Sequence, residues 1–158
     1  MALLKVEFDS ALCSIGQIGP LAVVVWRGEM LVDAARCQHS LIEREFKAGR
    51  TVGLIVVLED GVSAPSEEVR KILAVAADRF APHFVAQAVV VLGEGFRAAA
   101  VRGWITAVNL VTWAKTPAKS FSTPAEAVAW LRPKLGISVA RELSPGAILD
   151  AIGSLRKS

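Results

Sequence analysis

The sequence predicts a single α/β domain built on one mixed β-sheet, and two features of the chain carry this prediction. Three nearly continuous apolar segments have the length and composition of buried strands: Leu21–Trp26, Val52–Leu58 and Ala86–Leu92. Each is followed by a segment with apolar residues at helical spacing, so strands and helices alternate along the chain. We therefore expect these three strands at the centre of the sheet.

The chain before Leu21 predicts an antiparallel meander. Residues 4–8 alternate apolar and charged side chains, which is the period of a half-buried strand. Asp9–Ser10 is typical of a turn, Leu12–Ile18 predicts a second strand, and Gly19–Pro20 ends it before the third strand begins. The sheet should therefore start with antiparallel strands and is not a purely parallel one.

Apolar residues three and four positions apart predict the helices. The segments are 30–48, 65–80, 96–115, 123–131 and 144–155. Lys119–Phe121 predicts a short edge strand, and Thr123 with Glu126 forms the start of a capping box. We expect residues 1–135 to form the α/β domain, and residues 136–158 to form a linker and an appended C-terminal amphipathic helix.

Composition limits the classes of function. The 158-residue chain is 53% hydrophobic, but no apolar run reaches the roughly 20 residues that span a bilayer. Acidic residues among the first ten differ from a signal peptide, so we expect a cytoplasmic protein with no membrane span. The net charge of +3 comes from interleaved basic and acidic residues, which does not support nucleic-acid binding.

No catalytic or metal-binding pattern is evident. Cys13 and Cys37 lack CxxC spacing and fit small buried roles, and His39 and His83 lack carboxylates at metal-ligand spacing. Gly93-Glu94-Gly95 precedes a helix but lacks the lysine and serine or threonine of a phosphate loop. We expect no cofactor, no metal and no enzymatic activity.

Several packing residues resemble those of the STAS-like domain family, which has the anti-sigma-factor antagonist fold. They are Val89–Leu92 after Phe84, the aromatic Phe121, the pair Glu126-Ala127 and the pair Trp130-Leu131. The resemblance, to the group that is labelled together with SEC14 domains, covers residues 3–135. It implies helices mainly on one face of the sheet. It also implies a bacterial cytoplasmic regulator or scaffold that acts through protein contacts.

The same resemblance draws attention to the segment that precedes the second helix. STAS antagonists carry a phosphorylatable serine in an Asp-Ser pair there, whereas this chain has Asp60, Ser63 and Ser66 with no such pair. These three residues are candidates for phosphorylation or for a partner switch. The alternative is that one serine only caps the helix.

A second candidate site lies on the third helix. Val101, Ile105 and Trp113 extend its apolar surface beyond one face, which predicts an interface with a partner protein or a homodimer. The alternative is that the C-terminal helix folds back and covers them.

We therefore expect a non-enzymatic regulatory or scaffolding module. Two alternatives stay open: a SEC14-like module that binds a small apolar molecule or lipid, and an enzyme with an unrecognised site.

Overall fold

The computed structural model describes residues 3–94, 98–103 and 116–157. Its strands form one six-stranded sheet in the order β1-β2-β3-β4-β5-β6. The strands are β1 (Lys5–Asp9), β2 (Cys13–Ile18), β3 (Leu21–Trp26), β4 (Val52–Leu58), β5 (Phe84–Val91) and β6 (Ala118–Phe121). β1, β2 and β3 pair antiparallel, and β3 to β6 pair parallel. The predicted α/β fold class, with one mixed sheet and an antiparallel start, is confirmed.

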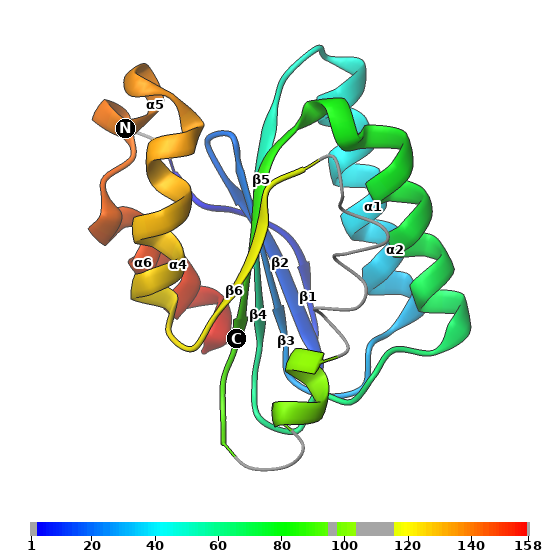
Figure 1. Cartoon of the computed structure of the whole chain (residues 1–158). Coiled ribbons are helices and arrows are strands. Elements are labelled where there is room, and N and C mark those ends of the chain that lie inside the picture. The colour runs from blue at the N-terminus through cyan, green and yellow to red at the C-terminus, as the bar shows by residue number, and fades with distance from the viewer. Residues whose placement is uncertain (1–2, 95–97, 104–115, 158) are drawn as a thin grey trace.

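The helices lie on both faces of the sheet (Figure 1). Two helices, α1 (Val32–Lys47) and α2 (Glu67–Phe80), pack on one face, and α4 (Pro124–Leu131) and α6 (Pro145–Arg156) pack on the other. The structure also has two short 3-10 helices, η1 (Ala81–His83) and η2 (Arg132–Leu135), and helix α5 (Ile137–Glu142). The expectation of helices mainly on one face is therefore corrected.

The physical reason for two covered faces lies in the central strands. Successive side chains of a strand point to opposite faces, and β3 is apolar at every position. Val24 belongs to the core beneath α1 and α2, whereas Val23 and Val25 belong to the core beneath α4 and α6. Both sets are fully buried, so each face needs its own layer of helices.

Polar caps set the predicted helix starts. The Ser66 hydroxyl accepts a hydrogen bond from the Val69 amide at 3.3 Å, and the Thr123 hydroxyl accepts from the Glu126 amide at 3.3 Å. The Thr123 hydroxyl also donates to the Glu126 carboxylate at 2.8 Å, so both side chains of the predicted capping pair meet at the start of α4. Residues 98–103 are helical, which agrees with part of the predicted third helix.

The C-terminal helix α6 packs against one face of the sheet and contributes to the core there. Ile148, Ile152 and Leu155 are each 1% exposed, within the core on the α4 side. The partly buried Arg27 guanidinium holds the end of α6 by donating to the Leu155 carbonyl at 2.8 Å. The described part of the chain contains no helix that is both long and apolar enough to cross a membrane.

Candidate functional site at the carboxyl ends of β4 and β5

The candidate site forms where two parallel strands end side by side. Leu58, the last residue of β4, pairs with Val91 of β5. Ala98 and Val101 lie close to the segments that follow these strands. A small open pocket of about 10 Å³ lies between the segments, lined by Leu58, Glu59, Asp60, Gly61, Val62, Val91, Leu92, Ala98 and Val101.

Asp60 and Gly93 approach each other at this pocket. An ideal Cβ at Gly93 would lie 3.0 Å from the Asp60 Oδ1 atom, closer than side chains normally pack. Gly93 also has φ +90°, a conformation that glycine adopts without steric cost. Glycine is therefore needed here both for the turn after β5 and for the approach of the Asp60 carboxylate.

Two arginines fix the segments around the pocket. The Arg156 guanidinium, in the last turn of α6, pairs with the Glu59 carboxylate at 3.0 Å. The Arg102 guanidinium donates to the carbonyls of Val91 at 3.2 Å and Gly93 at 3.3 Å. The pocket walls are thus tied both to α6 and to the helical residues 98–103. In the sequence, Gly93 belonged only to a motif that lacks the residues of a phosphate loop, and Glu59, Arg102 and Arg156 were not predicted as site residues.

The structure brings together residues from the two sequence-predicted sites. Asp60 and Val101 line the same pocket, although the sequence assigned them to separate sites. Ser63 and Ser66 are exposed in the segment between the pocket and α2. We refer to Asp60, Ser63, Ser66 and Val101 as the carboxyl-edge surface. Ile105 and Trp113 lie outside the described residues.

Ser63 and Ser66 differ in their local roles. Ser66 is the N-cap of α2, so the capping alternative holds for this residue. The side chains of Asp60 and Ser63 form no hydrogen bond or ion pair within the described part of the chain. Among the predicted switch residues, Ser63 therefore has a hydroxyl that no described group uses.

The C-terminal helix does not cover Val101. Val101 is partly buried against the core beneath α1 and α2, whereas α6 belongs to the core on the opposite face. The alternative in which the terminal helix folds back over this residue is therefore wrong for Val101. The sheet lies between Val101 and α6.

The size of the pocket limits what it can hold. A cavity of about 10 Å³ has room for about one water molecule, whereas pockets for organic ligands occupy roughly 300–1,000 Å³. The pocket next to Val101 is therefore too small for an apolar ligand or lipid in this conformation.

The histidines and cysteines that the sequence analysis considered as metal or redox candidates pack against other side chains or are buried. His39 stacks near Phe80 with 5.3 Å between ring centroids, and His83 lies 4.3 Å from Phe46. Burial raises the pKa of the Cys13 thiol to about 12, and burial is also the main reason that the pKa of Cys37 is raised. Among the described residues, no three histidines, cysteines or acids are arranged to hold a metal ion.

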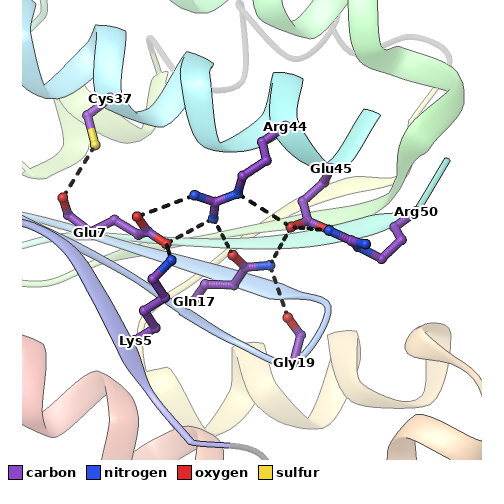
Figure 2. A network of polar contacts seen from close by, with 8 residues as sticks. All are labelled: Lys5, Glu7, Gln17, Gly19, Cys37, Arg44, Glu45 and Arg50. Atoms are coloured by element: carbon purple, nitrogen blue, oxygen red, sulfur yellow. Dashed lines mark hydrogen bonds and ion pairs between the residues drawn. The ribbon is translucent and has the colours of Figure 1, made fainter. Parts of the chain in front are cut away.

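A second polar cluster joins α1 to the antiparallel strands (Figure 2). Gln17 is its centre: its amide nitrogen donates to the Glu45 carboxylate at 3.0 Å, and its amide oxygen accepts from Arg44 at 2.8 Å. Arg44 also pairs with Glu7 at 2.9 Å, and Glu45 pairs with Arg50. We call Lys5, Glu7, Gln17, Arg44, Glu45 and Arg50 the α1 network.

The pairings in the α1 network favour the ionised carboxylates. The hydrogen bond from Arg50 lowers the pKa of Glu45, and the hydrogen bond from Arg44 lowers the pKa of Glu7. The Glu45 side chain is only 5% exposed, so pairing offsets the cost of burying its charge. This network was not predicted from the sequence. The available signal was Glu45, a charged residue that falls three residues after Ile42 on the inward face of α1.

Comparison with known proteins adds no family assignment. A scan against protein-family models finds no match, and a search of curated proteins finds no match either.

Proposed function

We propose that this protein is a non-enzymatic regulatory or scaffolding module that binds a partner protein through the carboxyl-edge surface. The observation that carries the proposal is the meeting of Asp60 and Val101 at one pocket. An exposed carboxylate beside a partly buried valine offers a partner both an apolar contact and a polar rim.

The position of this surface in the fold supports a binding role. Loops at the carboxyl ends of parallel strands commonly carry the binding residues of α/β proteins, because the strands beneath them are rigid. β4 and β5 are almost wholly buried, and they hold the two segments that carry Asp60 and Gly93. A partner would therefore meet a preformed surface.

Ser63 is the residue we propose as the regulatory switch. A phosphate on Ser63 would add about two negative charges close in sequence to Asp60 and Glu59. The added charge would repel an acidic partner surface and strengthen the attraction of a basic one. Ser66 is less suited because its hydroxyl oxygen already caps α2.

The resemblance to the STAS-like family supports the same class of function. The STAS-like fold has a strand meander followed by alternating helices and strands. The described elements of this chain follow that order. We therefore include STAS-like membership, a bacterial cytoplasmic setting and self-association through the third helix in the proposal.

Charge reversal on the carboxyl-edge surface tests the proposed function. Tagged wild-type protein, Asp60→Arg and the control Asp150→Arg, which alters an exposed residue of α6, are used to capture proteins from the native host. Mass spectrometry should find a partner that wild type and Asp150→Arg retain and Asp60→Arg loses. Retention of the same proteins by all three, at equal yield, would rule out this surface as the binding site.

A further inference from the structure

We propose that the β6 edge of the sheet is a second docking site, one that accepts an acidic peptide segment as an added strand. β6 is the last strand of the sheet, and among the described strands its only hydrogen-bonded neighbour is β5 (Figure 1). A strand at the edge of a sheet offers backbone groups to a further strand. This inference does not depend on the carboxyl-edge surface.

A row of aromatic and cationic side chains lies beside this edge. Lys119 Nζ is 5.6 Å from the Phe121 ring centroid, and Lys134 Nζ is 4.8 Å from the Trp130 ring centroid. The Phe121 and Trp130 centroids are 5.6 Å apart. We call these four residues the β6 row.

The charges of the β6 row select an acidic partner. Lys119 and Lys134 are both exposed, and neither forms an ion pair within the described part of the chain. Lys119 and Phe121 are two positions apart on β6, so they share one face of the strand. Alternate residues of an added strand would lie beside them, where carboxylates could pair with lysine and apolar side chains could cover the rings.

The opposite edge of the sheet lacks these properties. The register between β1 and β2 shifts between Val6 and Phe8, and such a bulge interrupts the pairing edge. Lys5 and Glu7 of β1 already pair with each other, and Glu7 also pairs with Arg44. β6 pairs with β5 in continuous register, so its outer edge is regular.

Other occupants fit the β6 row less well. Two copies joined edge to edge through β6 would bring like-charged lysines together. Stable attraction to an anionic membrane usually involves about four to eight basic residues, and the row has two. Nucleic-acid bases need open ring faces, whereas Lys134 already lies over the Trp130 ring.

The direction of the β6 backbone allows a specific test. The Gln87 amide of β5 donates to the Pro117 carbonyl at 2.8 Å. Because backbone groups alternate sides along a strand, the Ser120 N–H points away from β5. Ser120→Pro would remove an outward donor while leaving the pairing to β5 intact, and edge strands tolerate proline at such positions. Ser120→Ala is the matched control.

The experiment measures fluorescence anisotropy of a fluorescein-labelled peptide of alternating Glu and Val residues, with a Lys–Val peptide as the charge control. We expect the acidic peptide to bind wild type and Ser120→Ala alike, and to bind Ser120→Pro at least tenfold more weakly. Lys119→Glu combined with Lys134→Glu should weaken binding as much, whereas the control pair Lys71→Glu with Lys157→Glu should not. Circular dichroism checks that each variant is folded.

Four outcomes would overturn the proposal. In the first, the acidic peptide does not bind wild type. In the second, it binds Ser120→Pro as tightly as Ser120→Ala. In the third, the Lys–Val peptide binds wild type as tightly as the acidic peptide does. In the fourth outcome the acidic peptide does not bind, and the β6 edge has another occupant. Either the protein binds phosphatidylserine vesicles, or it self-associates with rising concentration and Ser120→Pro abolishes this self-association.

Discussion

The α1 network and the carboxyl-edge surface are both polar, but their side chains are used differently. In the α1 network, Glu45 is buried and contacts Arg50, Arg44 and Gln17. At the carboxyl-edge surface, Asp60 is exposed and its side chain has no polar partner among the described residues. Polar groups that satisfy one another stabilise the fold, whereas exposed groups on a rigid support are available to a partner. We therefore assign stability to the first region and binding to the second.

The largest expected effect on stability comes from breaking the α1 network. Glu45→Ala should lower the free energy of unfolding by about 2 kcal/mol, because it removes charged hydrogen bonds and leaves Gln17 with an unpaired donor. Urea denaturation measures this change. The control Glu67→Ala removes an exposed pair with Lys71 and should have almost no effect. Equal losses in the two variants would contradict the distinction between the regions.

Gly93 tests whether the support beneath Asp60 is rigid. Gly93→Ala should destabilise the protein by about 1–2 kcal/mol, because φ is positive and the new Cβ would press on the Asp60 carboxylate. Gly153→Ala is the matched control: it lies inside α6 with open space around it, so alanine should stabilise the helix slightly. Thermal unfolding of both variants should give shifts of opposite sign. Shifts of the same sign would show that the turn after β5 yields to the added methyl group.

Acid should weaken the α1 network, because its carboxylates stabilise the fold in their ionised form. The pKa values of Glu7 and Glu45 are lowered in the folded protein, so these groups contribute stability above their unfolded pKa values. That contribution is lost as the pH falls below about 4.5 and through the lowered folded values. Urea denaturation between pH 7 and pH 3 should show a steeper loss for wild type than for Glu45→Gln. If the stability of wild type and Glu45→Gln fell with pH at the same rate, the ionised Glu45 carboxylate would not contribute to stability.

The sequence predicted the parts of the fold that depend on local patterns. The central strands follow from their apolar runs, and the starts of α2, α4 and α6 follow from Ser66, Thr123 and Ser144. The distribution of helices over both faces was predicted less well. A wholly apolar strand such as β3 needs cover on both faces, but the strand alone does not show which helix covers which face.

The site depends on contacts that no local pattern contains. Asp60 and Val101 are far apart in the sequence and meet only because β4 and β5 are parallel neighbours. Gln17 joins Glu45 and Arg44 because β2 lies beneath α1, which depends on the tertiary arrangement. The chemistry of each residue could be read from the sequence, whereas their association could not.

The smallest expected effect on stability comes from Asp60 itself. Asp60→Asn and Asp60→Arg should change the free energy of unfolding by less than about 0.5 kcal/mol, since surface substitutions without partners rarely do more. Urea denaturation checks this value. A loss comparable with that of Glu45→Ala would mean that Asp60 serves the fold, and its assignment to binding would fail.

Site-specific photo-crosslinking tests directly whether a partner binds the carboxyl-edge surface. A benzophenone amino acid is placed at Ser63 on the carboxyl-edge surface, or at Asp150 on the exposed side of α6, in the full chain within its native host. We predict that a discrete crosslinked protein forms from position 63, that it is absent from position 150, and that Asp60→Arg abolishes it. A discrete adduct from position 150 with none from position 63 would show that the partner does not bind at the carboxyl-edge surface.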